Sequence, residues 1–401
     1  MTSPEAPVRT EQQVPSLAGD PFGETVLSDP FEFQRELRER GPVVYLPEYG
    51  VYGMGRYEEV RAALVNWQAF LSGNGVGVNP ARQHPKSAIL ELDPPDHDAP
   101  RHTLEPLLGP RRLARFKDEW VDKAEALVDE LVQREHVDAV SDLAEAFPLS
   151  VFPDAIGISD EGRESLLLYS DHLFNLFGPH NALVERGQAA FPEIASRIED
   201  QVHRDALAPD GFGSELWEAA DHGDITGELA GGLVRSLLIA GIDTTVHSLG
   251  AIIEAFLSAP DQWQALRADP RRARVAFDEA VRWASPVQTF FRTASRDVVV
   301  GDATVPEGEK ILMFLGSANR DPRRWHDPDS FDLNRDPSGH VGFGMGIHRC
   351  VGQHVARLEA ECVLHALARR VSRIEPAGEP SLHLNNTLRG WKTLPVRLVP
   401  A

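Results

Sequence analysis

The segment that most restricts how this chain can fold is a glycine-rich loop, residues 343–352, with the sequence FGMGIHRCVG. Glycine has no Cβ atom, so the backbone of this loop can lie very close to a flat or bulky group. Near its end stands Cys350, after which residues 355–367 show apolar residues at helical spacing. The positive end of a helix dipole favours a thiolate, the form of cysteine that binds metals. The loop therefore predicts a thiolate that binds the iron of a haem.

Two other interpretations of this loop stay open from the residues alone. A structural zinc site could be assembled from His340, His348, Cys350 and His354. It would leave the glycines and the neighbouring Phe343 without a role, and it lacks the paired cysteines of a zinc knuckle. A lone cysteine is also often a small buried apolar residue. The alternative function on this basis is a zinc-stabilised helical binding protein without catalytic activity.

The composition argues against several classes of function. The chain has 401 residues, of which 42% are apolar and 25% charged, as in ordinary globular proteins. A formal charge of −21 argues against nucleic acid as a partner. Two cysteines are too few for a disulfide framework and suit a reducing cytoplasm. Residues 1–19 do not resemble a signal peptide, and no apolar run approaches the ~20 residues that span a membrane.

The order of the sequence patterns predicts a mainly α fold with a minor β portion. We expect residues 1–25 to form a flexible arm and residues 26–401 a single domain. Helical spacing recurs over residues 31–40, 57–66, 110–116, 120–135, 143–147, 159–177, 182–206, 226–257 and 273–283. Short runs typical of strands occupy residues 43–45, 51–52, 290–293, 298–300 and 310–314. A long loop over residues 71–90 has the length of a lid over a site.

The longest helical pattern, residues 226–257, contains residues that do not favour a helix at its centre. Gly241 costs ~1 kcal/mol relative to alanine, and Asp243 and Thr244 compete for backbone hydrogen bonds. We therefore predict a local opening of this helix at a functional site. A second helical pattern, residues 273–283, places Glu279 and Arg282 three residues apart, so that they can pair.

Together these motifs resemble the cytochrome P450 family from about residue 25 to the end of the chain. The loop matches the family's haem-binding signature at Phe343, Gly344, Gly346, His348, Cys350 and Gly352. In the long helix, the oxygen-activating motif of the family is matched by Ala240, Gly241, Asp243 and Thr244. Glu279 and Arg282 match its buried ion pair, which is structural and which Arg335 is expected to join.

The resemblance implies a haem b between the long helix and the cysteine helix, with Cys350 as the axial iron ligand. Thr244 would bind dioxygen by a hydrogen bond, and Asp243 would relay protons from solvent. The haem would also contact Phe343, Gly344, Gly352, Ala240 and Gly241. The family's partners for the haem propionates are matched by His97, Arg101, Arg292 and His348.

The resemblance also implies a separate electron donor, because the chain contains no flavin or nicotinamide fingerprint. In soluble bacterial members the donor is an iron–sulfur ferredoxin, reduced by an NAD(P)H-dependent reductase. Such donors are commonly acidic, so a basic patch is expected on the cysteine side. Its members would be Arg111, Arg112, Arg115, Arg320, Arg323, Arg324 and Arg349.

A closer resemblance is to bacterial P450s that oxidise para-substituted benzoic acids and remove their methyl ethers. It rests on residues 147–155, 174–179, 233–238, 285–292 and 385–390. It implies a narrow apolar pocket for a small aromatic acid such as 4-methoxybenzoate, oxidised with O2 by hydroxylation or O-demethylation. The substrate contacts implied are Ser87, His84, Phe174, Phe177, Arg235, Ser236, Ala240, Val287 and Phe290.

The chain departs from these relatives where an arginine is expected to bind the substrate carboxylate. His84 stands at that position, with Arg82 and Lys86 nearby. A neutral small aryl compound or a terpene is therefore the alternative substrate.

Overall fold

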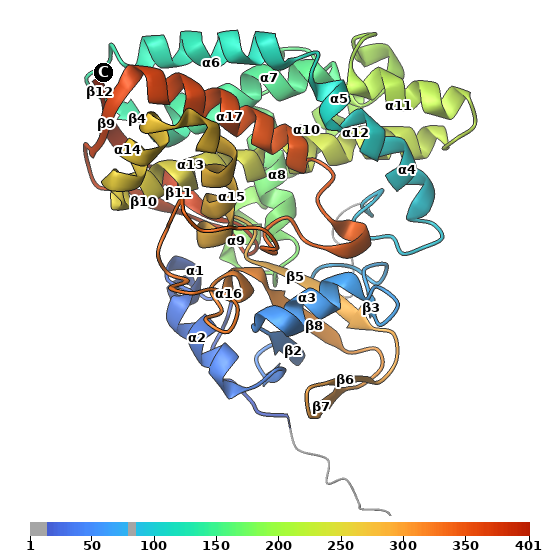
Figure 1. The fold of residues 1–401 in the computed structure, drawn as a ribbon. Helices are drawn as coiled ribbons and strands as arrows, with labels where there is room; N and C mark the ends of the chain where they lie inside the picture. The colour runs from blue at the N-terminus through green and yellow to red at the C-terminus, as the bar shows by residue number, and fades with distance from the viewer. Residues whose placement is uncertain (1–13, 79–85) are drawn as a thin grey trace, which may run out of the picture.

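The computed structural model describes residues 14–78 and 86–401, and it consists of a large helical layer and a smaller part built on β-sheets (Figure 1). This confirms the predicted mainly α fold with a minor β portion. Figure 1 shows the N-terminal helices beside the sheets, whereas helices from the middle and the end of the chain form the other layer. The loop that carries Cys350 connects the two parts.

The main sheet joins two distant parts of the chain in the strand order β1-β2-β8-β5-β3. The N-terminal strands are β1 (Val44–Leu46), β2 (Val51–Met54) and β3 (Phe70–Leu71), and the later strands are β5 (Thr289–Ala294) and β8 (Lys310–Phe314). Strands β1 and β2, which overlap the runs predicted at 43–45 and 51–52, form an antiparallel hairpin; β2 runs parallel to β8, and β5 is antiparallel to β8. This pairing fixes β5, and with it Arg292 and Phe290, at the edge of the helical layer.

Three small sheets complete the β portion. The first pairs β6 (Val298–Val300) with β7 (Ala303–Val305), and the second pairs β10 (Ser381–Leu384) with β11 (Arg389–Thr393). The third has the order β4-β12-β9, formed by β4 (Val137–Asp138), β12 (Pro395–Pro400) and β9 (Val371–Pro376). The β10–β11 hairpin packs beside the helices, and its register places His383 opposite Gly390.

The helices near the main sheet are α1 (Glu24–Ser28), α2 (Phe31–Arg40), α3 (Tyr57–Val65) and α16 (Leu315–Asn319). The first part of the helical layer contains α4 (Asp98–Leu107), α5 (Pro110–Leu113), α6 (Lys117–Leu131), the π-helix η1 (Ala139–Glu145), α7 (Ala146–Ile156) and α8 (Ser165–Asn175). It continues with α9 (Ala182–Gln188), α10 (Phe191–Gln201), α11 (Phe212–Asp221), α12 (Gly227–Gly241) and α13 (Asp243–Ser258). The last helices are α14 (Pro260–Ala268), α15 (Ala273–Ala284) and α17 (Gln353–Arg370). Four short 3₁₀ or π segments include η2 (Arg204–Ala206), η3 (Pro270–Arg272) and η4 (Gly346–His348).

The long central helix is interrupted where the sequence predicts an opening. Helix α12 ends at Gly241, α13 begins at Asp243, and Ile242 between them has φ −106° and ψ −64°. By length and composition alone, residues 227–258 are long and apolar enough to cross a membrane. The sequence prediction did not include them, because Arg235 interrupts the apolar run. Of the most apolar window, 72% is buried inside the protein, as expected of a core helix.

One sequence prediction about local structure is wrong, and helix α11 was not predicted. Residues 14–25 are not a flexible arm, because Leu17 and Phe22 are buried at 1% and 4% exposure in the core beside the main sheet. Residues 1–13 lie outside the described part of the chain. Helix α11, which the sequence patterns did not predict, begins at Phe212 between Gly211 and Gly213. A Cβ atom at either glycine would come within 3 Å of the Ile156 carbonyl oxygen, so they serve close packing.

Candidate functional site

The cysteine loop is held by backbone hydrogen bonds and by left-handed glycines. The Cys350 amide donates to the Phe343 carbonyl at 2.8 Å, and the Gly344 amide donates to the Val341 carbonyl at 2.8 Å. Gly344 and Gly346 have φ values of +63° and +67°, which residues other than glycine rarely adopt. A Cβ atom at Gly346 would also lie 2.6 Å from the Leu64 carbonyl oxygen of α3. This glycine therefore permits close contact with the protein's own backbone.

The thiol of Cys350 lies three residues before α17 rather than inside it. Burial raises the pKa of Cys350, while the Gly352 amide, Arg101, Arg357 and the Gln353 amide act in the opposite direction. The helix N-terminus thus contributes in the direction that the sequence predicts, but burial outweighs it. In this environment a thiolate gains its stability mainly from a bound metal ion.

A group of nitrogen donors surrounds one edge of the same pocket. The rings of His97 and His348 touch edge to face with centroids 4.7 Å apart, and the Nε2 atom of each is buried without a hydrogen-bond partner among the described residues. Arg292 of β5 is buried at 3% exposure, and its Nη1 donates to the Phe291 carbonyl. Arg101 donates to the Arg349 carbonyl at 2.7 Å.

The pKa shifts of His348, His97 and Arg292 show that their burial is not balanced by a nearby negative charge. Burial, followed by the charge of Arg292, lowers the pKa of His348 to about 2. Burial also lowers the pKa of His97, with Arg101 as the next cause, and it lowers the pKa of Arg292 to about 10. Four donors converge here from α4, its N-terminal flank, β5 and η4. A bound dianion would satisfy the orphaned nitrogens.

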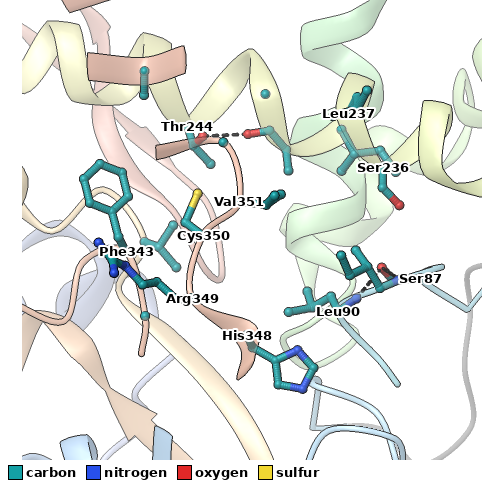
Figure 2. A pocket seen from close by; sticks show the side chains of 18 of the residues that line it. Ser87, Leu90, Ser236, Leu237, Thr244, Phe343, His348, Arg349, Cys350 and Val351 are labelled. Carbon is teal, nitrogen blue, oxygen red and sulfur yellow. Dashed lines mark hydrogen bonds between the residues drawn. The ribbon is translucent and has the colours of Figure 1, made fainter. Parts of the chain in front are cut away.

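Across the pocket from Cys350 lies the break between α12 and α13 (Figure 2). The Thr244 hydroxyl donates to the Ala240 carbonyl at 2.7 Å, and the Ser248 hydroxyl donates to the Thr244 carbonyl at 2.7 Å. Thr245 makes a similar bond to Gly241 at 3.3 Å. Such side-chain bonds to the preceding turn bend helices and compete with the helical ladder.

Gly241 has a packing role that the sequence does not reveal. A Cβ atom at this position would lie 2.1 Å from Cε1 of Phe152 in α7. The helix therefore passes the Phe152 ring with no space for a side chain. The glycine is required by this contact, whatever space it also leaves in the pocket.

One pocket brings together nearly all the predicted site residues (Figure 2). Its lining contains Thr244, Cys350, Arg101, Arg292, His348, Phe343, Gly344, Gly352, Ala240, Gly241, Ser87, Phe174, Phe177, Arg235, Ser236, Val287 and Phe290. Figure 2 shows the Cys350 sulfur directed toward the helix that carries Thr244. Besides the structural pair Glu279 and Arg282, two predicted residues that the structure describes do not line it: His97, whose ring contacts that of His348, and Asp243. His84 and Arg82 fall outside the described residues.

Comparison with known proteins identifies the family. The cytochrome P450 family model matches residues 214–395. Cytochrome p450 CYP199A2 from Rhodopseudomonas palustris is 51% identical, with 98% of each chain covered. The chain belongs to the cytochrome P450 family. A solved structure of CYP109Q5 from Chondromyces apiculatus is 30% identical with a TM-score of 0.80, and covers 96% of this chain and 99% of that one.

A further neighbour is the solved structure of cytochrome P450 CREJ in complex with (4-ethylphenyl) dihydrogen phosphate. It is 25% identical, has a TM-score of 0.87, and covers 95% of this chain and 99% of that chain. Cytochromes P450 are monooxygenases that carry haem b, and they receive electrons from a redox partner. The thiol of Cys350, the orphaned His97 and His348 nitrogens, and the buried Arg292 fit the thiolate ligand and the anionic propionates of a haem.

The zinc interpretation of this loop finds no support in the geometry. Among the described residues, no group of three or more His, Cys, Asp or Glu side chains could hold a metal ion. His340 instead accepts a hydrogen bond from the Gly342 amide at 3.2 Å, within the loop itself.

The substrate side of the pocket is apolar with a polar end. The Phe174 and Phe177 rings meet edge to face at 5.8 Å, and Phe177 lies 5.9 Å from Phe290. The Ser236 hydroxyl donates to the Gly232 carbonyl at 2.9 Å, and the Ser87 hydroxyl accepts from the Leu90 amide at 3.0 Å. The sequence comparison did not assign Lys86 to the substrate, but Lys86 lines the pocket as well.

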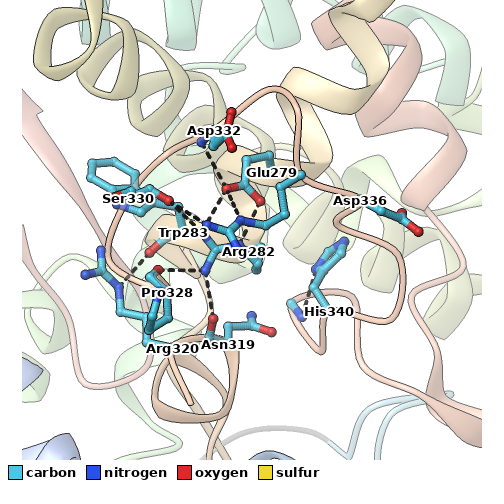
Figure 3. Close-up of polar contacts among 12 residues, drawn as sticks. Glu279, Arg282, Trp283, Asn319, Arg320, Pro328, Ser330, Asp332, Asp336 and His340 are labelled. Atoms are coloured by element: carbon cyan, nitrogen blue, oxygen red, sulfur yellow. Dashed lines mark hydrogen bonds and ion pairs between the residues drawn. The ribbon is translucent and has the colours of Figure 1, made fainter. Parts of the chain in front are cut away.

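Glu279 and Arg282 form the predicted ion pair, completely buried on the cysteine side (Figure 3). Arg282 donates to both Glu279 oxygens at 2.7 and 2.8 Å, and also to the Asn319, Pro328 and Ser330 carbonyls. Arg335 adds a third cationic contact to Glu279 at 3.0 Å. The pair lies outside the pocket lining and binds neighbouring segments together.

The predicted basic patch is largely neutralised. Arg320 is buried at 8% exposure, pairs with Asp329, and lies 4.0 Å above the Phe31 ring. Arg112 and Arg115 both pair with Glu215, and Arg323 pairs with Glu39 and Asp321. The patch was expected from the resemblance to the family, and that resemblance does not reveal which acidic side chains fold against each arginine.

Sequence reasoning missed the polar residues that surround Asp243. These are His247 one turn later in α13, His383 in β10 and Asp171 in α8. The spacing of Asp243 and His247 was visible as an i, i+4 pair. The other two come from segments more than 70 and 130 residues away, and no local pattern connects them.

Proposed function

We propose that this P450 oxidises a small para-substituted aromatic acid such as 4-methoxybenzoate, by hydroxylation or by oxidative O-demethylation. The observation that carries the proposal is a pocket with aromatic edges at its apolar side and Ser87, Ser236 and Lys86 at its polar side. A benzene ring fits between such edges and small aliphatic side chains. Its para substituent is then presented to the centre between Cys350 and Thr244.

Two likenesses support this substrate class. The chain resembles bacterial P450s that oxidise para-substituted benzoic acids. The solved neighbour P450 CREJ contains (4-ethylphenyl) dihydrogen phosphate, a para-substituted aryl compound with an anionic end. Both compounds combine a flat ring with a negative charge opposite the para position.

The pocket also gives a specific reason to consider a neutral aryl substrate. Arg235 lines the pocket but is ion-paired with Glu199, so its charge is already balanced. Lys86 is then the remaining cation that the described residues place beside Ser87 in the lining. A neutral methoxyarene would need neither cation.

We assign the remaining roles from the same geometry. Cys350 is the haem ligand, and His97, Arg101, Arg292 and His348 bind the propionates. The bound haem supplies the iron at which O2 is reduced and activated. Thr244 lines the pocket and would exchange its bond to the Ala240 carbonyl for one to dioxygen, and Asp243 would supply protons to this site. The apolar lining excludes water from the substrate side.

The electron donor proposed is an iron–sulfur ferredoxin with its NAD(P)H-dependent reductase, and the location proposed is the cytoplasm. Arg349, beside Cys350, and Arg111 are the members of the predicted patch best suited to an acidic donor. Charge reversal at both should slow reduction by ferredoxin at low salt, and unchanged rates would refute this docking site.

Ligand titration tests the substrate class. We expect 4-methoxybenzoate to shift the haem absorbance and to yield formaldehyde on turnover with the donor system. Lys86→Gln should weaken 4-methoxybenzoate about tenfold, the loss of one charge-assisted bond, and leave neutral 4-methoxytoluene unaffected. Lys392→Gln, on the exposed surface, is the matched control. Saturating 4-methoxybenzoate without a spectral shift, together with a clear shift by the neutral compound, would exclude the acid.

A further inference from the structure

Asp243 lies against a group of buried polar side chains rather than in the lining of the pocket. Its Oδ1 is 3.3 Å from Nε2 of His247, one helical turn away, and both side chains are at most 7% exposed. Among the described residues, Oδ2 of Asp243 has no hydrogen-bond partner. The carboxyl group thus connects the α12–α13 break to the side of the helix away from Cys350.

The outer end of this group reaches solvent. His383 of β10 contacts Asp171 of α8, with Nε2 and Oδ1 2.7 Å apart, and their side chains are 26% and 32% exposed. Asn385 donates to the same Asp171 oxygen at 2.8 Å and fixes its orientation. A partly exposed imidazole–carboxylate pair of this kind can exchange protons with water.

His247 lies between the outer pair and Asp243. Its ring centroid is 5.1 Å from that of His383, with 32° between the planes. Neither nitrogen of His247 has a hydrogen-bond partner among the residues that the structure describes. Two orphaned buried nitrogens cost stability, so a role other than stability accounts for them better.

Gly390 makes this position of His247 possible. A Cβ atom at Gly390 would lie 2.1 Å from Nδ1 of His247, a distance that no side chain tolerates. In the β10–β11 hairpin, Gly390 is the residue opposite His383. In this hairpin His383 therefore stands beside the space that Gly390 leaves without a side chain, and the ring of His247 occupies that space.

The pKa shifts show that the two ends of this group, His383 and Asp243, bind a proton more readily than His247 between them. Burial raises the pKa of Asp243 to about 7; the charges of Asp171 and Glu145 act in the same direction, and the charge of His383 and the Ser170 hydroxyl oppose it. Burial lowers the pKa of His247 to about 3. For His383, burial is outweighed by the hydrogen bond and the charge of Asp171, with Asp243 adding to them and Arg186 opposing, so its pKa is raised.

We propose that Asp171, His383 and His247 form the route by which protons pass from solvent to Asp243 during turnover. The proton enters on His383, whose charge Asp171 balances. His247 accepts a proton at Nδ1 and releases one from Nε2 to Oδ1 of Asp243. One bridging water, or a small rotation of His383, closes the gap between the rings. Asp243 then passes its proton on toward the pocket, His383 regains a proton from water, and tautomerisation of the neutral His247 ring through the bridging water returns every group to its starting state.

The reaction of the family requires such a supply, because one oxygen atom of O2 enters the substrate and the other leaves as water. The inference rests on this monooxygenase reaction and is independent of which substrate is oxidised. His247 is the critical member, since it is the buried link between the surface and the carboxyl group.

The first test compares His247→Leu and His383→Gln with His222→Gln, which changes an exposed histidine after α11. We expect both relay variants to oxidise substrate at least tenfold more slowly with the electron-donor system, with a larger solvent isotope effect and more hydrogen peroxide released per NADH. Turnover driven by added hydrogen peroxide, which brings its own protons, should stay within twofold of the unmodified enzyme. Unchanged donor-driven rates, or an equal loss in the peroxide-driven reaction, would overturn the proposal.

The second test does not depend on activity. In histidine-labelled, haem-loaded protein kept diamagnetic with carbon monoxide, Asp243→Asn should shift the ring ¹⁵N signals of His247 and His383. His247→Leu should melt at the same or a higher temperature, because it removes unpaired buried nitrogens. Absent ¹⁵N shifts, or a clear loss of stability in His247→Leu, would overturn the relay. Any compound that the enzyme oxidises can serve as substrate, so failure of 4-methoxybenzoate leaves these tests intact.

Discussion

Removal of the Arg282 side chain should destabilise this P450 on its cysteine side. In the protein, Arg282 is completely buried and makes five hydrogen bonds, two to Glu279 and three to backbone carbonyls. Arg282→Ala leaves Glu279 with Arg335 at 3.0 Å and the Asp332 amide at 3.2 Å. Breaking a buried pair by removing one partner costs about 3–5 kcal/mol. That is a large share of the ~5–15 kcal/mol by which typical domains are stable.

The loss should reach the cysteine loop through Asn319. Arg282 binds the Asn319 carbonyl at 2.9 Å, and Oδ1 of Asn319 accepts from the Val341 amide at 2.8 Å. Val341 in turn holds Gly344 in the loop that carries Cys350. We therefore expect Arg282→Ala to lose haem at urea concentrations where the helical layer is still folded.

Urea titration of the haem-loaded protein measures both effects, with the haem absorbance reporting on the loop and circular dichroism on the helices. Arg335→Ala is the matched control, because it removes the outer cation but leaves the inner pair intact. It should cost less than half as much as Arg282→Ala. If Arg282→Ala costs less than about 1 kcal/mol and both signals still coincide, the buried pair does not support the loop as argued.

Three further predictions follow from single positions. Gly346→Ala should destabilise the loop by at least ~1 kcal/mol, because φ is +67° and the new Cβ would lie 2.6 Å from the Leu64 carbonyl; haem retention on gel filtration reports it. Asp243→Asn should stabilise the fold relative to the unmodified protein, and by an amount that grows between about pH 4 and 7. The reason is that the pKa of Asp243 is raised to about 7, so the unmodified fold loses the proton that stabilises it as the pH rises. If the melting temperatures of the two proteins differ by the same amount at pH 5 and pH 8, this reasoning is contradicted. Cys350→Ala should abolish the thiolate-type spectrum of the reduced carbon monoxide complex, and a retained spectrum would disprove the ligand assignment.

The sequence predicts the parts of this protein whose structure depends on local pattern. The β1–β2 hairpin, α2, α3 and the break at Gly241 are where the spacing and the turn residues place them. The loop around Cys350 also follows from local chemistry, since left-handed backbone at Gly344 and Gly346 requires glycine. Residues 14–25 were misjudged because their polar composition conceals Leu17 and Phe22, which are buried only through contacts with the distant main sheet.

Side-chain partners from distant segments could not be predicted in the same way. The neutralisation of part of the basic patch was not predictable, because Glu215 pairs with Arg112 and Arg115 across about a hundred residues. Gly241 was correctly singled out, but its contact with Phe152 depends on how α7 packs on α12. A motif identifies the residue that chemistry needs, whereas tertiary packing decides which neighbours adjust its charge.

Asp243 shows most clearly how these two levels combine. The acid–alcohol pair with Thr244 is visible in the sequence, but the two side chains are not equivalent in the fold. Thr244 lines the pocket, whereas Asp243 faces His247, and the ring of His247 is held where Gly390 leaves space. Because Gly390 and His383 are opposite each other in one hairpin, the β10–β11 sheet controls both the gap and the exposed end of the relay. A small sheet remote from Cys350 thereby determines whether protons reach the site where oxygen is reduced.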